Sequence, residues 1–322
     1  MPGPDLAVAS GLAEDRRVHD PAQLHVTQPL SIASMRELIL AADPGLSGAS
    51  FTVLEDGWDS VAVDVGNEYI FKFPREPDAA WSLEKEARLL EVLRPHLSIP
   101  IPALELLPGP PVFSRHRKIP GSHLLEADYA KLPECARHAL AEQLATFYLQ
   151  LHRLDPQPLV AAGATPVPGW PEAGELILDL ETLLDGPLFR AAADALRAWE
   201  ALPLDPRGSV YGFFDGHGWN MAFDHERQVL NGIFDFADSG FGDLHREFIY
   251  TDLIHRDLTR RVVGYYESLA GFPLDRNRID LLSGVLCLSE LAGESGHPTH
   301  GPLIRRNAET WLRHRLDRPG EF

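Results

Sequence analysis

An aspartate and an asparagine stand five positions apart on a glycine-rich stretch. The stretch is Phe214-Asp215-Gly216-His217-Gly218-Trp219-Asn220, and two short apolar segments follow it, the second ending near Asp235. Transfer of a phosphoryl group from a nucleotide needs one carboxylate that accepts a hydroxyl proton. It also needs an amide oxygen and a second carboxylate that hold metal ions. We therefore expect Asp215 to be a catalytic base and Asn220 with Asp235 to hold Mg²⁺, which prefers oxygen ligands. The alternative roles are loop capping and turn hydrogen bonds.

A lysine and a glutamate complete the expected set. Lys72 is one of four lysines in the chain and lies within the apolar run Ile70–Phe73, where an unpaired ammonium would be costly. Glu86 lies on the next predicted helix and can pair with it. In kinases such a lysine contacts the nucleotide phosphates and the helix glutamate positions it. An exposed edge-strand lysine is the alternative, but the order Lys, Glu, Asp/Asn loop, Asp favours a nucleotide site.

Two other residues of this loop could take part in catalysis or binding. His217 is tempting as a base or metal ligand, but a solvated or loop-bonded histidine is the better interpretation. Trp219 is interpreted as a packing residue rather than a stacking platform. The remaining histidines show no metal-ligand spacing such as His-Glu-x-x-His.

The hydrophobic pattern predicts elements that would position these residues. The first third alternates with period two after a short helix, and the rest is mainly helical. Expected strands are 51–55, 61–65, 69–73, 104–107, 112–114, 210–214, 221–224 and 229–235. Expected helices are 34–44, 82–93, 133–154, 172–184, 188–202, 244–256, 258–269, 278–291 and 303–316.

Length and charge limit the class of protein. The 322 residues are enough for two lobes. The formal net charge is −18, which argues against a nucleic-acid partner. Two cysteines make no disulfide framework. We see neither a signal peptide nor a membrane span and expect a cytoplasmic protein, with residues 1–30 as a poorly ordered extension.

Several stretches in this order resemble the aminoglycoside phosphotransferase family, the small-molecule branch of the protein-kinase-like fold. They are Gly57-Trp58-Asp59-Ser60, Glu68–Arg75, Lys85–Leu90, Arg117–Gly121, Leu151-His152 and Asp235–Asp243. The resemblance implies an α+β fold with two lobes. A small antiparallel-sheet lobe that binds nucleotide would cover residues 31–116, and a larger helical lobe with the catalytic and acceptor sites would cover residues 117–322.

The resemblance also implies further nucleotide contacts. Gly57 and Ser60 would close over the phosphates of ATP or GTP, and Mg²⁺ would be required. The base would lie at a hinge around residues 113–116, with Ser114 and His116 beside it. This chain departs from the family pattern at the catalytic loop. Members of the family usually have His-Gly-Asp there, whereas this chain has Phe213-Phe214-Asp215.

The acceptor is expected to be a small, cationic molecule such as an aminoglycoside. Residues 155–205 hold nine Asp and Glu against two Arg, and a negative surface attracts ammonium groups. Asp238, Glu247 and Asp252 add carboxylates after the metal stretch and are candidate acceptor contacts. Choline-like, amino-acid, sugar and macrolide acceptors stay open, as do a non-catalytic nucleotide-binding protein and the oligomeric state. A protein kinase is disfavoured because Asp-Phe-Gly and Ala-Pro-Glu are missing.

Overall fold

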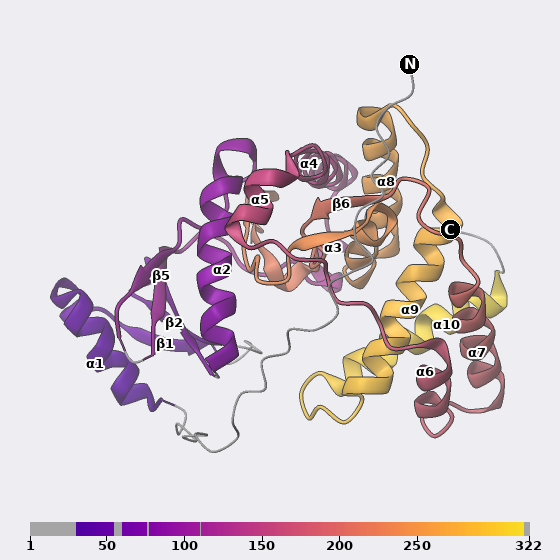
Figure 1. The fold of residues 1–322 in the computed structure, drawn as a ribbon, viewed down its shortest axis with the longest axis horizontal. Helices are drawn as coiled ribbons and strands as arrows, with labels where there is room; N and C mark the ends of the chain where they lie inside the picture. Colours follow the sequence, from indigo (N-terminus) through magenta and orange to yellow (C-terminus); the bar gives the residue numbers. More distant parts are fainter. Residues whose placement is uncertain (1–29, 55–59, 76, 110, 319–322) are drawn as a thin grey trace.

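A five-stranded antiparallel sheet forms the smaller of two lobes in this computed structural model, which describes residues 30–54, 60–75, 77–109 and 111–318 (Figure 1). Its strand order is β1-β2-β3-β5-β4. Helix α2 stands between this sheet and the helical lobe (Figure 1). The elements of the lobe are α1 (Ile32–Ala42), β1 (Phe51–Leu54), β2 (Ser60–Val65), β3 (Tyr69–Pro74), α2 (Pro77–Leu93), β4 (Glu105–Leu107) and β5 (Phe113–Arg117).

Strand β3 lies at the centre of the sheet and carries Lys72. On it Lys72 pairs with Ala62 of β2 and with Ser114 of β5. Side chains alternate across a strand, and Phe71 and Phe73 are buried on the face opposite to Lys72. Phe73 stacks on Phe113 with ring centroids 4.8 Å apart. The buried aromatic face therefore fixes the register, and the register turns Lys72 away from that core.

The larger lobe is mainly helical. Helix α4 buries Leu140, Leu144, Phe147 and Leu151, which recur at helical spacing, and it packs against α8. Its helices are α3 (Glu126–Tyr129), α4 (Glu134–His152), α5 (Pro156–Ala162), α6 (Ala173–Leu180), α7 (Gly186–Glu200), α8 (Arg256–Ala270), α9 (Arg276–Glu294) and α10 (Gly301–Asp317). Helices α3 and α5 were not predicted, because runs of four and seven residues are too short to show helical periodicity.

Two short ribbons in this lobe carry the expected site. Strand β6 (Ser209–Gly212) pairs with β9 (Gly240–Asp243), and β7 (Met221–Asp224) pairs with β8 (Val229–Ile233). The catalytic stretch follows β6, and Asp235 follows β8. Strand β9 was not predicted, because glycines at two of its four positions hide the alternation.

The structure corrects some element boundaries. The helix expected over 244–256 is a 3₁₀ segment, Leu244–Leu253, and the strand expected over 229–235 ends at Ile233. Asp235 therefore lies in a loop rather than on a strand. In the described part of the chain, no helix has both the length and the apolarity needed to cross a bilayer. The expected extension 1–30 falls almost wholly outside the described residues, and the lobe division at residue 116 stays a prediction.

Candidate active site

Lys72 of the small lobe contacts two carboxylates, one in each lobe. Its Nζ lies 2.9 Å from Asp235 Oδ1 and 3.5 Å from Glu86 Oε2. Burial opposes the charged ammonium, but the negative charges of Asp235 and Glu86 outweigh it and raise the pKa of Lys72. The ammonium of Lys72 in turn lowers the pKa of Asp235. Lys72 is thus fully charged, and the structure brings together three residues that the sequence predicted as one set.

Glu86 also fixes the loop that carries Asp235. The Glu86 side chain is buried, and its Oε1 accepts a 2.9 Å hydrogen bond from the backbone N–H of Phe236. Burial is the main reason that the pKa of Glu86 is raised. The same carboxylate therefore holds Lys72 with one oxygen and the Asp235 loop with the other.

The catalytic loop closes on itself between Asp215 and Asn220. Asn220 Nδ2 donates to Asp215 Oδ2 at 2.5 Å and to the Asp215 carbonyl oxygen at 3.1 Å. The Asn220 carbonyl oxygen accepts a 3.0 Å hydrogen bond from the Phe234 N–H. The hairpin of β7 and β8 therefore returns the chain beside Asn220, one residue before Asp235. This juxtaposition is the one that the sequence predicted.

Asn220 and Asp235 suit a magnesium ion. Because Asn220 Nδ2 donates to Asp215, its amide oxygen is left for an ion. The side chain of Asp235 is 45% exposed, so solvent and small ligands can reach it. Among the described residues, no group of three or more His, Cys, Asp or Glu side chains could hold a metal by itself. Two protein oxygens completed by phosphate and water oxygens are typical of Mg²⁺ bound with a nucleotide.

The backbone before Asp215 is held by a buried glutamate. Glu247 is fully buried, and it accepts hydrogen bonds from Phe213 N at 2.9 Å and Phe214 N at 3.0 Å. His152 Nε2 lies 3.3 Å from Glu247 Oε2, and His152 Nδ1 lies 2.8 Å from the Tyr266 hydroxyl. The expectation that Glu247 contacts the acceptor is wrong, because both of its oxygens are engaged inside the lobe.

The two phenylalanines in this loop fill space rather than offer hydrogen bonds. Phe213 packs on Phe236, with ring centroids 4.7 Å apart. Phe214 adopts a left-handed φ of 53°, which is unusual for a residue with a side chain. Its ring lies against Gly212 and Gly242, where an added Cβ would approach it to 2.8 Å. Glycines on the β6–β9 ribbon therefore make room for the Phe214 ring.

The remaining acceptor candidates, Asp238 and Asp252, have different surroundings. Asp238 is exposed, and its charge acts on Lys85 of α2. Asp252 is half-buried, accepts a 3.3 Å hydrogen bond from Thr259, and has its pKa raised to about 6 by burial. One carboxylate was missed: Glu290 of α9 acts on Asp215, and burial raises the pKa of Glu290 to about 7. No local signal could have found it, because only tertiary packing brings α9 to the catalytic loop.

The nucleotide-base candidates need a correction. Ser114 is buried within β5 and has neighbours on both sides, Lys72 of β3 and Leu106 of β4, so it is an interior sheet residue rather than part of a hinge. His116 is also buried, its Nδ1 lies 2.9 Å from the Arg117 carbonyl oxygen, and burial lowers its pKa to about 4. Ser60 begins β2 and is half-buried, whereas Gly57 lies outside the described residues.

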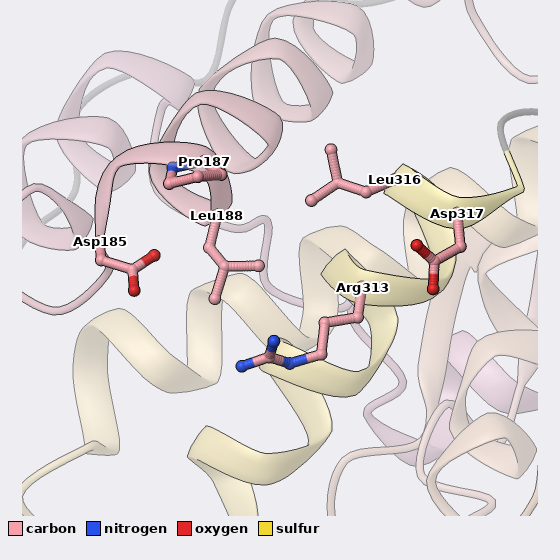
Figure 2. A pocket seen from close by; sticks show the side chains of 6 residues that line it. All are labelled: Asp185, Pro187, Leu188, Arg313, Leu316 and Asp317. Carbon is pink, nitrogen blue, oxygen red and sulfur yellow. The ribbon is translucent and has the colours of Figure 1, made fainter.

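Two hollows lie away from these residues. One of about 330 Å³ opens between the start of α7 and the end of α10 (Figure 2). Another of about 500 Å³ lies beside residues 117–120 and the β7–β8 turn. Neither is lined by Lys72, Asp215 or Asp235, so the candidate site is defined by its polar contacts rather than by these hollows.

The two lobes and the polar side chains between them are the architecture of a kinase-like phosphotransferase. Comparison with known proteins gives the same class. The profile of the phosphotransferase enzyme family matches residues 50–282. The chain belongs to that family. Similar structures include APH(2″)-IIIa with GDP and kanamycin, at 24% identity and TM-score 0.72, with 88% of this chain and 99% of that chain covered.

Two further structures extend the comparison. The streptomycin–ATP–APH(2″)-IIa ternary complex is 20% identical, with TM-score 0.60 and coverage of 88% of this chain and 97% of that one. The macrolide 2′-phosphotransferase MphH from Brachybacterium faecium is 19% identical, with TM-score 0.61 and coverage of 89% and 99%. At these identities the similarity establishes the shared fold, and the acceptor of this chain must be argued from its own residues.

Proposed function

We propose that this protein transfers the γ-phosphate of ATP or GTP to a hydroxyl group of a small cationic molecule, with an aminoglycoside as the first candidate. The observation that carries the proposal is the contact of Lys72 with both Glu86 and Asp235, beside the closed pair of Asp215 and Asn220. A non-catalytic nucleotide-binding role has less support, because every member of the expected set is present and engaged.

Asp215 is the proposed catalytic base. The acceptor oxygen attacks the γ-phosphorus, the bond from that phosphorus to the bridging oxygen breaks, and the hydroxyl proton passes to Asp215. Lys72, held by Glu86, presents its ammonium to the nucleotide phosphates. Mg²⁺ held by Asn220 and Asp235 would neutralise charge on those phosphates.

A cationic acceptor fits the carboxylates near the base. Glu290 acts on Asp215 from α9, and the segment 155–205, which includes α6 and α7, holds nine acidic residues against two arginines. An ammonium group would offset the repulsion between Glu290 and Asp215 and would be attracted into the site. The known complexes of APH(2″) enzymes with kanamycin and streptomycin support aminoglycosides as the first compounds to test.

A nucleotide-consumption assay tests the proposal. Purified protein with Mg²⁺ and either ATP or GTP is supplied with kanamycin, gentamicin, streptomycin, a macrolide, choline and glucose, and mass spectrometry detects the phosphorylated acceptor. We expect phosphorylation of at least one aminoglycoside, and its loss in Asp215→Ala with nucleotide binding retained. Phosphorylation of only the macrolide or a neutral sugar would reject the cationic acceptor, and full turnover by Asp215→Ala would reject the base.

A further inference from the structure

We propose that His217 is a positioning residue that fixes the carboxylate of Asp215 for catalysis. The inference rests on the proposed function, because it takes Asp215 to be the base. His217 Nε2 lies 3.1 Å from Asp215 Oδ1, while Asn220 Nδ2 holds Oδ2 of the same carboxylate. His217 and Asn220 contact different oxygens of the Asp215 carboxylate. Rotation of the Asp215 side chain about its χ angles would therefore break at least one of these contacts.

The backbone leaves the imidazole little freedom to move. His217 lies between Gly216 and Gly218, and an added side-chain carbon at either glycine would collide with a neighbour. The neighbour is the Tyr148 hydroxyl at Gly216 and the Leu124 carbonyl at Gly218. Leu124 N also donates to the Gly218 carbonyl at 3.0 Å, and His217 N donates to the Asp215 carbonyl at 2.8 Å. The ring is therefore placed by a loop that is fixed on both sides.

Of the two side chains that contact the Asp215 carboxylate, His217 is the one with no second role in the proposed site. Asn220 is shared, because its amide oxygen is the proposed ligand of the metal and its amide nitrogen holds Asp215. The two residues before Asp215 are phenylalanines, whose side chains offer no hydrogen bond. Nε2 can donate to Asp215 in both the neutral and the protonated imidazole, so the role does not depend on titration of His217.

The other ring nitrogen fits the same assignment. His217 Nδ1 is buried and has no hydrogen-bond partner among the described residues. Nε2 is therefore the ring nitrogen through which the imidazole contacts a polar side chain of the described structure. The charges of Asp215 and Glu290 both act on this ring.

Hydrolysis of Mg-ATP and Mg-GTP, with water as the acceptor, tests the role without a known acceptor. The variants are His217→Leu, which removes the donor, and His217→Gln, whose amide nitrogen can occupy the place of Nε2. We expect His217→Leu to lower kcat about 10- to 100-fold with the nucleotide KM changed less than about two-fold, since misplacing a catalytic group by 1 Å costs rate of this order. His217→Gln should recover most of the loss. His96→Leu, an exposed histidine in the turn after α2, is the matched control.

A double-mutant cycle separates positioning from general damage. In the Asp215→Ala background, His217→Leu should change the residual rate less than about two-fold, because the group it positions is gone. The inference is overturned if His217→Leu keeps wild-type turnover, if the loss is equal in both backgrounds, or if His217→Gln is no better than His217→Leu. If Asp215→Ala itself keeps full turnover, Asp215 is not the base and the positioning role falls with it, whereas loss of turnover in Asp215→Ala together with wild-type turnover in His217→Leu rejects the positioning role alone. If His217→Leu does not fold, His217→Asn replaces it and is compared with His217→Gln in the wild-type and Asp215→Ala backgrounds. The same rate differences then decide the outcome.

Discussion

Glu86 of α2 accepts the backbone N–H of Phe236 at 2.9 Å, and this buried hydrogen bond ties the small lobe to the loop that carries Asp235. The same carboxylate reaches Lys72 at 3.5 Å. Glu86 therefore contacts both Lys72 in the small lobe and the loop of the larger lobe that carries Asp235.

The first prediction separates the two contacts of Glu86. Glu86→Gln keeps an acceptor for Phe236 N–H but loses the charge, so we expect kcat/KM for nucleotide to fall at least 10-fold with little loss of stability. Glu86→Ala leaves that buried N–H unsatisfied and should also lower the free energy of unfolding by about 1–3 kcal/mol. Urea unfolding and steady-state kinetics measure both, with Glu84→Gln on the exposed face of α2 as control. Equal stability of both variants would contradict the structural contact.

The second prediction concerns Lys72. Lys72→Ala should weaken nucleotide binding about 10-fold or more, because the charged ammonium is held for the phosphates by two carboxylates. Calorimetric titration with the magnesium complexes of ATP and GTP measures the effect. Lys131→Ala, on an exposed lysine, is the control. Unchanged nucleotide affinity together with unchanged turnover would count against Lys72 as a phosphate ligand.

The third prediction concerns Glu247. Glu247→Ala deprives the N–H groups of Phe213 and Phe214 of their acceptor, so we expect a loss of about 3 kcal/mol in the free energy of unfolding. Turnover of the remaining folded protein should fall because the backbone before Asp215 is released. Urea unfolding followed by fluorescence checks the stability, with the exposed Glu200→Ala as control. A variant of wild-type stability would show that water replaces the carboxylate at no cost.

The fourth prediction weighs strain against burial at Phe214. Phe214→Gly relieves a left-handed backbone that costs about 1–2 kcal/mol. It also removes a buried ring, which costs about 3–5 kcal/mol. The loss of the buried ring outweighs the relief of strain, so we expect net destabilisation by about 1–4 kcal/mol, measured by thermal and urea unfolding. An increase in stability would mean that the ring contributes little against Gly212 and Gly242. We also expect the double change of Phe213-Phe214 to His-Gly to reduce activity, because it removes both buried rings. If the rings contribute little, the same double change would preserve activity.

The fifth prediction is a pH dependence at Asp252. Burial raises its pKa from 3.8 to about 6, so the folded state binds a proton more tightly than the unfolded state. Between those values the contribution of Asp252 to stability therefore falls as pH rises, by at most about 3 kcal/mol. Asp252→Asn should match the wild type near pH 3.5 and gain on it up to about pH 6.5, with a constant difference above. Urea unfolding at closely spaced pH values checks this, and a difference independent of pH would refute it.

Much of the site was predictable because its members are marked by local context. Lys72 is a lone charge in an apolar strand, Asp215 and Asn220 share a short glycine-rich loop, and Asp235 ends a hairpin. Residue type and spacing were sufficient for these. The hinge prediction was wrong at Ser114 because the sequence does not reveal that β4 adds a neighbour on the far side of β5.

The amino-acid sequence by itself determined the antiparallel sheet, the helical lobe and the order of the polar residues, because alternation, helical periodicity and turn chemistry are local. Only the tertiary structure decided that Glu247 accepts hydrogen bonds from the loop, that the charge of Glu290 acts on Asp215 and that Glu86 accepts the Phe236 N–H. Each of these depends on which faces of distant helices are buried together, and burial determines whether a carboxylate meets solvent, a backbone N–H or another charge.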